Sequence, residues 1–170
     1  MHLGKHTAIR GDFGHCFPAD FRDTLPAGGS VAEFRSTIIP GHRYRNARVA
    51  IDWLCHVFGF ERQVIYEGEN GTIAHAQLTL GGGMVMLGSG KDDEYGRGFR
   101  SPLELGGIET RSSYIQVPDA DFVYARAVAA GAQVVRPLQD TPYGSREFTV
   151  KDPEGHSWTV GTYDPWAPQE

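Results

Sequence analysis

The chain of 170 residues has only two cysteines, no long apolar run and no excess of basic residues. Cys16 and Cys55 are too few for a disulfide framework, so we expect two reduced thiols. No segment approaches the roughly 20 apolar residues of a membrane span, and the N-terminus lacks the apolar core of a signal peptide. The formal net charge of −5 comes with no basic cluster to meet phosphates. The sequence therefore predicts a cytoplasmic protein that binds neither membranes nor nucleic acid.

Common catalytic motifs are missing as well. The sequence has no Gly-x-Ser-x-Gly nucleophile elbow, no Gly-x-x-x-x-Gly-Lys phosphate loop and no His-Glu-x-x-His metal motif. The run Gly81–Gly83 is flanked by strand-like segments and leads into no helix N-terminus, so we interpret it as a hairpin turn and not as a phosphate site. The sequence therefore contains no common motif that would identify a catalysed reaction.

What the sequence does contain is a turn at residues 152–156, Asp-Pro-Glu-Gly-His, between two strand-like segments. Pro153 presets φ at one corner of the turn, and Gly155 can adopt the positive φ of the other corner. The flanking segments 148–150 and 158–160 are rich in β-branched and aromatic residues. We predict a β-hairpin whose turn exposes His156 to solvent.

An earlier part of the chain repeats this plan at a fixed offset. The turn glycines Gly83 and Gly155 are 155 − 83 = 72 residues apart, and Gly59 and Gly131, which each end a helix-like run, are 131 − 59 = 72 residues apart. A repeat of this kind is most simply explained by one structural module used twice. In each copy the patterns predict the order βαβββ.

The helix boundaries in both copies carry recognisable signals. Asn46 and Asp119 are good N-caps. Pro40 lies inside the first predicted strand, residues 36–44, and removes a ladder donor, so this strand should lie at a sheet edge or carry a bulge. We expect the second helix to bury Phe122, Ala125, Val128 and Ala129. The predicted organisation is a loop-like N-terminal extension (1–35), a first module (36–88), a crossover loop with lid character (89–111), a second module (112–163) and a tail (164–170).

The doubled βαβββ order, the run Arg45–Glu61 and the run Phe148–Trp158 resemble the vicinal oxygen chelate superfamily. This group includes glyoxalase I, extradiol dioxygenases, fosfomycin-resistance enzymes and bleomycin-resistance proteins. Within it, the sequence of these two runs is most similar to glyoxalase/bleomycin-resistance-like proteins of the PhnB-like kind. The resemblance implies an α+β fold in which each module curls its sheet into a half-barrel and the paired modules enclose a cavity. It also implies a homodimer.

The resemblance implies metal-ligand positions on the first and last strands of each module. Transferred to this chain, they fall at Ile39, Met86, Ser112 (or Ser113) and Thr159. Alkyl, thioether and hydroxyl groups do not replace the imidazole and carboxylate donors that a divalent cation needs. We therefore expect no metal and no other cofactor at these positions.

The alternative to a metal-free cavity is a metal site displaced by one or two residues, with histidines as ligands. His42 lies an odd number of residues from Ile39, which places it on the opposite strand face. His75 would lie on the face opposite Met86 if the triple-glycine turn were symmetrical, and His56 suits a helix C-terminus. No clustering of donors is visible in the sequence.

The favoured hypothesis is a metal-free cavity that binds a small organic molecule, and the alternative is a metal-dependent glyoxalase-like lyase or dioxygenase. Strand alternation also places Ala76 and Glu147 on the cavity wall, where a buried Glu147 would be a candidate general base. Arg146 at the rim is suited either to an anionic ligand group or to a structural salt bridge. Trp53 and Trp158 are suited to ligand stacking or to the core. The candidate ligand-binding residues are Ile39, Leu78, Met86, Ser112, Tyr143, Arg146, Thr149 and Thr159.

Overall fold

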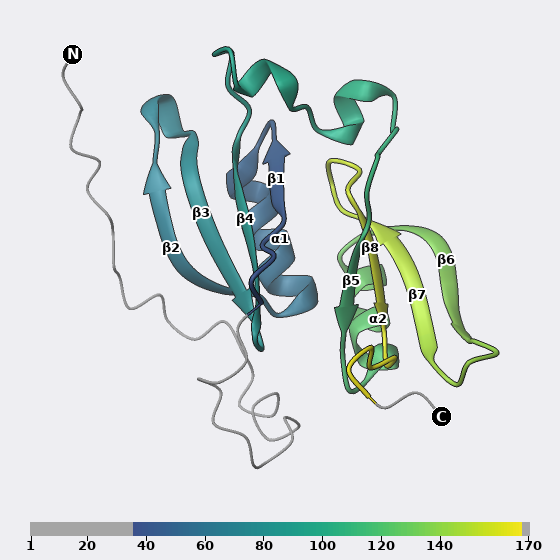
Figure 1. The fold of residues 1–170 in the computed structure, drawn as a ribbon. Helices are drawn as coiled ribbons and strands as arrows, with labels where there is room; N and C mark the ends of the chain where they lie inside the picture. The colour runs from purple at the N-terminus through teal and green to yellow at the C-terminus, as the bar shows by residue number, and fades with distance from the viewer. Residues whose placement is uncertain (1–35, 168–170) are drawn as a thin grey trace.

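A computed structural model describes residues 36–167, and the predicted extension and the last three residues lie outside the described residues. The described chain contains the βαβββ order twice (Figure 1), which confirms the predicted fold class. The first module comprises β1 (Gly41–Tyr44), α1 (Ala47–Phe58), β2 (Glu61–Glu67), β3 (Ile73–Leu80) and β4 (Gly83–Ser89). The second comprises β5 (Ser113–Gln116), α2 (Ala120–Ala129), β6 (Gln133–Asp140), β7 (Arg146–Lys151) and β8 (Ser157–Gly161). Short 3₁₀ turns lie at η2 (Glu69–Gly71), η3 (Gly96–Gly98) and η4 (Pro102–Leu105).

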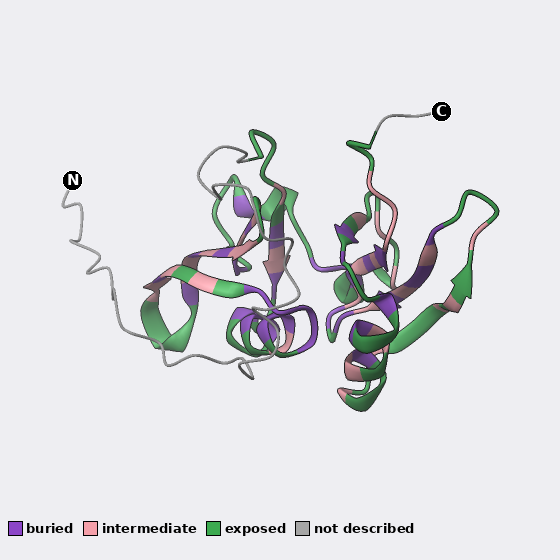
Figure 2. Ribbon diagram, turned by 90° about the horizontal axis from the view of Figure 1, so that it is seen from below, coloured by how far each residue is buried: buried purple, intermediate pink, exposed green. Residues whose placement is uncertain are grey.

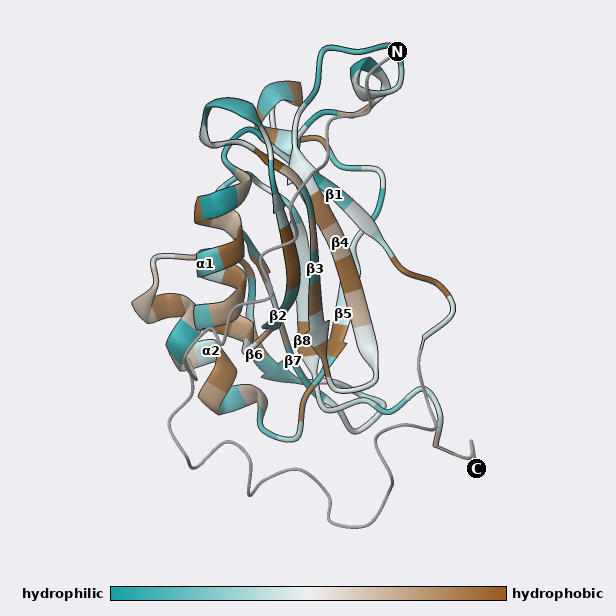
Figure 3. Cartoon of the chain, turned by 90° about the vertical axis from the view of Figure 1, so that its left-hand side faces the viewer, coloured by the Kyte–Doolittle hydropathy of each residue, from teal (hydrophilic) through white to brown (hydrophobic). Residues whose placement is uncertain are grey.

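Each module forms a four-stranded sheet of the same topology. The strand orders are β1-β4-β3-β2 and β5-β8-β7-β6, with parallel pairing between the first and last strand of each module and antiparallel pairing elsewhere. Both helices lie on one side of the sheets, and no helix within the described residues covers the other side (Figure 3). We call this uncovered side the open face. Strands β1 and β6 lie at sheet edges, and the described strands close no barrel.

The first helix follows the sequence signals closely. The side chain of Asn46 accepts a hydrogen bond from the backbone N–H of Val49 at 3.3 Å, and Gly59 ends the helix with φ 84°. These observations confirm both predicted caps. The buried positions of α1 share one stripe and include Ala47, Ala50, Ile51, Leu54, Cys55, Val57 and Phe58.

The second helix begins as predicted but turns a different side to the sheet. Asp119 accepts a hydrogen bond from the N–H of Phe122 at 2.9 Å, which confirms the N-cap. The predicted apolar stripe is wrong, because its four residues Phe122, Ala125, Val128 and Ala129 are exposed. The small residues Ala120 and Ala127 are buried instead, together with Val123. Small side chains allow α2 to approach its sheet closely.

The turn at residues 152–156 does more than connect β7 to β8. The carboxylate of Asp152 accepts hydrogen bonds from the hydroxyl of Tyr44 at 2.7 Å and from Nε1 of Trp158 at 3.2 Å. The carboxylate of Glu154 accepts bonds from the backbone N–H groups of Arg45 and Asn46 at 2.7 and 2.6 Å, immediately before α1. This turn of the second module therefore holds the β1–α1 junction of the first module.

We call this contact between the modules the seam, and its side chains are almost fully enclosed. Figure 2 shows buried positions gathering where the two halves of the chain meet. The predicted exposure of His156 is wrong, since the side chain is only 4% exposed and packs against the ring of Tyr44. The seam consists of His42, Tyr44, Glu109, Asp152, Glu154, His156 and Trp158. None of the helices within residues 36–167 has the length and apolarity needed to cross a bilayer.

Candidate functional site

The register of the β3–β4 hairpin decides which residues reach the open face. Leu80 pairs with Gly83, so the turn has two residues and not the symmetrical three that the sequence suggested. Because side chains alternate along a strand, this shift by one residue exchanges the two faces of β3 relative to β4. Leu78 therefore pairs with Val85 and is fully buried beneath α1, and the predicted orientation of Leu78 toward the cavity is wrong.

The same shift affects the neighbours of Leu78 on β3. Ala76 is fully buried in the core, so its predicted orientation is also wrong. Gln77 pairs with Met86, and His75 lies two residues before Gln77 on the same strand face. His75 therefore shares the open face with Met86, contrary to the expectation from a symmetrical turn.

The half of the open face that β3 and β4 provide combines a thioether, an imidazole and an amide group. Nε2 of His75 lies 3.2 Å from Nε2 of Gln77. Partial burial lowers the pKa of His75, and the positive charges of Arg43 and Lys91 lower it further. Met86 is half-buried beside these groups. A neutral imidazole beside a thioether makes this half of the face adaptable and only weakly charged.

The half that β7 and β8 provide holds a buried carboxylate. Glu147 is 3% exposed, accepts a hydrogen bond from Nη2 of Arg136 at 2.9 Å and accepts another from the hydroxyl of Tyr143 at 3.0 Å. Gly161 makes room for it, because a Cβ there would lie 2.5 Å from Cγ of Glu147 and 2.8 Å from the hydroxyl of Tyr114. The predicted general base is thus an ion-paired carboxylate held by three strands and a loop.

Hydroxyl groups surround this carboxylate. Oγ1 of Thr149 and Oγ1 of Thr159 lie 3.0 Å apart on adjacent strands, and the hydroxyl of Tyr114 donates to the carbonyl of Tyr163 at 3.2 Å. Burial raises the pKa of Tyr114, and the nearby charge of Glu147 raises it further. The phenol is therefore a neutral hydrogen-bonding group at physiological pH.

The remaining predicted site residues are divided between the rim and other surroundings. Ile39 and Ser112 are exposed just before β1 and β5. Arg146 does not reach the open face, because it forms ion pairs with Asp121 at 2.6 Å and with Asp140 at 3.0 Å. Of the two uses that the sequence left open for Arg146, the salt bridge is the one found.

The two tryptophans belong to the core side of the sheets. Trp158 is 1% exposed and lies against Phe58 and Phe60. Trp53 is partly buried and meets Phe58 edge-on, with the ring centroids 5.2 Å apart. Core packing, and not ligand stacking, is therefore the use found for both side chains.

The metal-ligand positions that the fold implies do not suit a metal in this chain. Met86 and Thr159 provide a thioether and a hydroxyl that is already bonded to Thr149, and Ile39 provides no donor. A divalent cation of the glyoxalase type needs imidazole or carboxylate ligands. No catalytic step through a metal at these positions follows from this set of residues.

One group of potential metal ligands lies in the seam. Donor atoms of His42, Glu109 and His156 lie within 4.8 Å of one another. His42 is on the side of β1 away from the open face, as the odd spacing from Ile39 predicted. Glu109 was not singled out in the sequence, because it lies in the polar crossover loop without any local motif.

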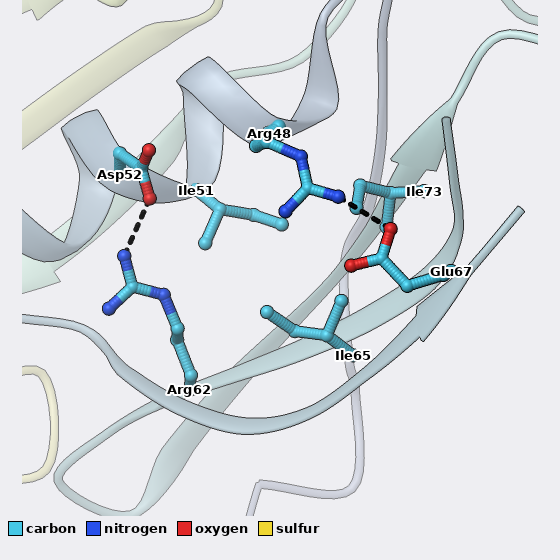
Figure 4. A pocket seen from close by; sticks show the side chains of 7 residues that line it. All are labelled: Arg48, Ile51, Asp52, Arg62, Ile65, Glu67 and Ile73. Atoms are coloured by element: carbon cyan, nitrogen blue, oxygen red, sulfur yellow. Dashed lines mark hydrogen bonds and ion pairs between the residues drawn. The ribbon is translucent and has the colours of Figure 1, made fainter. Parts of the chain in front are cut away.

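A separate pocket of about 260 Å³ lies between α1 and the sheet of the first module (Figure 4). Ile51, Ile65 and Ile73 contribute its apolar surface. Two ion pairs cross it from helix to strand, Arg48 to Glu67 at 2.5 Å and Arg62 to Asp52 at 2.6 Å. Because each arginine already has a carboxylate partner, we interpret the pocket as a gap bridged by surface ion pairs.

The sequence and the fold match a known class of proteins. The sequence profile of the Glyoxalase/Bleomycin resistance protein/Dioxygenase superfamily matches residues 42–160, which include both modules and the seam. The chain belongs to this superfamily.

Individual relatives support the same assignment. The uncharacterized protein Rv0887c of Mycobacterium tuberculosis is 34% identical over 116 residues, which cover 68% of this chain and 68% of the relative. The solved structure of TioX from Micromonospora sp. ML1 has a TM-score of 0.56 at 32% identity and covers 74% of this chain and 97% of TioX. The fosfomycin resistance protein FosX from Mesorhizobium loti has a TM-score of 0.54 at 16% identity, covers 76% of this chain and 93% of FosX, and shows the fold alone.

Proposed function

We propose that the open face binds a small organic molecule without using a metal at the positions that the fold implies. The observation that carries this proposal is the buried carboxylate of Glu147, held by Arg136 and Tyr143 on a sheet surface that no described helix covers. No described helix packs over this charged network, so packing against a core does not explain why the network is on this side of the sheet. A few fixed polar groups beside apolar surface are typical of small-molecule sites.

The side chains on this face suggest the chemistry of the ligand. Met86 provides polarizable apolar surface, and Thr149 and Thr159 provide hydroxyl groups that can both donate and accept. Nη2 of Arg136 donates to Glu147, and the side chain of Arg136 is still partly exposed to solvent. The proposed ligand is a molecule with a planar or apolar body and at least one hydrogen-bonding edge.

A second copy of the chain is our proposed cover for this face. An open sheet surface leaves a bound molecule partly in water, whereas small-molecule sites bury most of the ligand. The homodimer implied by the family resemblance would enclose the site, and it stays a prediction. Size-exclusion chromatography with light scattering tests it independently of any ligand.

The alternative function, a metal-dependent lyase or dioxygenase with a displaced metal site, is less well supported. A catalytic metal needs an open coordination position beside bound substrate. The group of His42, Glu109 and His156 is instead enclosed in the seam, on the side of β1 away from the open face. The binding function therefore agrees better with the distribution of polar groups.

The binding proposal is tested by a thermal-shift screen with aromatic and glycopeptide compounds. A ligand should raise the melting temperature saturably, because it binds only the folded state. The variant Thr159→Trp fills the open face and should abolish the shift. Val128→Trp, on the exposed side of α2, is the matched control and should retain it. An equal shift in Thr159→Trp would place the ligand elsewhere and contradict the proposal.

A further inference from the structure

The seam contains one buried side chain whose polar atoms have no partner. His42 is 3% exposed, and neither Nδ1 nor Nε2 makes a hydrogen bond. Its ring stacks on Trp158 at 5.1 Å between centroids and meets the edge of His156 at 4.9 Å. Leaving buried polar groups unpaired costs about 1 to 3 kcal/mol, so an imidazole at this position needs an explanation that a leucine would not.

The ring nitrogens of His42 suit a metal ligand. Neither Nδ1 nor Nε2 makes a hydrogen bond, so either nitrogen can direct a lone pair at an ion without breaking an existing contact. Neutral histidine coordinates metals through such a lone pair.

The other two donors are already oriented by contacts on their far sides. Nε2 of His156 lies 3.0 Å from the carbonyl oxygen of Arg43, which leaves Nδ1 to face Glu109 at 2.8 Å. Oε2 of Glu109 accepts a hydrogen bond from the N–H of Ser157 at 2.6 Å, which leaves Oε1 directed toward the histidine. A carbonyl behind a histidine and an N–H behind a carboxylate are the outer contacts that orient metal ligands.

The charges around the three residues are mixed. The guanidinium of Arg111 hydrogen-bonds to the carbonyl of Gly41 and contributes positive charge near His42. The buried carboxylates of Asp152 and Glu154 contribute negative charge to the same seam. Glu154 already pairs with Arg45 at 3.9 Å, so Glu109 and Asp152 are the carboxylates left to balance the charge of a bound divalent ion.

We propose that His42, Glu109 and His156 bind a divalent transition-metal ion of the Zn²⁺ type, which clamps the crossover loop and the second module onto β1. Two imidazoles and one carboxylate would fill three positions of a tetrahedral Zn²⁺ ion, and a water molecule would complete the fourth. Ligands on one Zn²⁺ lie about 3.3 Å apart, so donors now within 4.8 Å need only side-chain adjustment. The enclosure of the seam assigns the ion a structural role.

The test uses full-length protein without a polyhistidine tag, stripped of metal with a chelator and then titrated with Zn²⁺ or Co²⁺. We expect one ion per chain, a Co²⁺ absorption spectrum of tetrahedral type, and a rise of about 5 to 10 °C in melting temperature at a hundredfold excess over Kd. His42→Leu should abolish all three effects. His75→Leu on the open face is the matched control and should retain them.

The two variants also separate metal loss from misfolding. In chelator, His42→Leu should melt no lower than the wild type, because leucine removes the two unpaired nitrogens from the core. An absent Zn²⁺ response in the wild type, or an equal response in His42→Leu, overturns the proposal. The ligand screen on the open face is run in chelator and with Zn²⁺, so the failure of one proposal leaves the other testable.

Discussion

The seam and the open face are both rich in polar side chains, but they differ in how water reaches them. In the seam, Asp152, Glu154 and His156 are each at most 6% exposed, and their hydrogen bonds connect the two modules. On the open face, Thr149 and Thr159 are half-buried, and their hydroxyls bond mainly to each other. Polar groups enclosed between modules specify how the modules join, whereas polar groups beside water remain available to a ligand.

The Asp-Pro-Glu-Gly-His turn, which supplies three of the seam's polar side chains, is also held by hydrogen bonds within itself. Gly155 has φ 89°, which permits the turn, and the N–H groups of Glu154 and His156 both bond to Oδ1 of Asp152. The turn is therefore rigid before it meets the first module. A rigid turn reduces the conformational entropy lost when the seam forms.

The largest expected effect on stability comes from Asp152→Ala, which tests whether the polar groups of the seam hold the two modules together. The change leaves four donors without an acceptor, namely the hydroxyl of Tyr44, Nε1 of Trp158 and the backbone N–H groups of Glu154 and His156. We expect the free energy of unfolding to fall by about 3 to 5 kcal/mol, the range for removing one partner of a buried charged network. Chemical denaturation monitored by circular dichroism measures it.

The matched control for this prediction is Asp92→Ala in the crossover loop. Asp92 is exposed, so the substitution should change the free energy of unfolding by less than about 0.5 kcal/mol. If Asp152→Ala were as mild as its control, the seam would not hold the modules together, and the contrast with the open face would fail.

A second prediction uses pH to isolate one hydrogen bond of the seam. Burial raises the pKa of Tyr44 well above 10.0, and the neighbouring charge of Asp152 raises it further. In the unfolded chain the phenol ionises near its ordinary pKa of 10. The stability that this hydroxyl contributes is therefore fully present below pH 10 and is lost as the pH rises toward the folded-state pKa.

The comparison protein for this prediction is Tyr44→Phe. At pH 8 we expect it to be less stable than the wild type by about 1.5 to 2 kcal/mol, because the bond goes to a carboxylate. At pH 11 the difference should shrink by about 1.4 kcal/mol, since only the wild type gains an ionised tyrosine at this position on unfolding. Denaturant titrations at both pH values measure the two differences. A difference that stays constant would show that Tyr44 ionises equally in both states.

Most of the fold could be predicted from the sequence because its signals are local. The caps at Asn46 and Asp119, the stop at Gly59 and the edge position of the first strand are confirmed, although this strand begins at Gly41 and does not contain Pro40 as predicted. Each of these signals depends on residues within one turn of the chain. The stripe on α2 was mispredicted because hydrophobicity alone ranks Phe122 above alanine, whereas close packing on the sheet selects small residues.

The candidate sites were less predictable because they depend on register and on distant contacts. One residue fewer in the β3–β4 turn exchanged Leu78 and His75 between the core and the open face. The seam joins His42 to Glu109 and His156, which lie 109 − 42 = 67 and 156 − 42 = 114 residues away in the sequence. No local pattern in the sequence reports contacts of this range.

The smallest expected effect on stability comes from a substitution on the open face, and it is compared with the effect of Asp152→Ala in the seam. Thr159→Val keeps the β-branched shape and removes only the hydroxyl that faces Thr149 at 3.0 Å. Because both positions are partly exposed, water can replace the lost partner, and we expect the free energy of unfolding to change by less than about 1 kcal/mol. Denaturant unfolding of the two proteins under identical conditions measures this difference. A loss as large as that of Asp152→Ala would mean that this hydroxyl pair stabilises the fold as the seam does, and the pair would then be an unsuitable anchor for an exchangeable ligand.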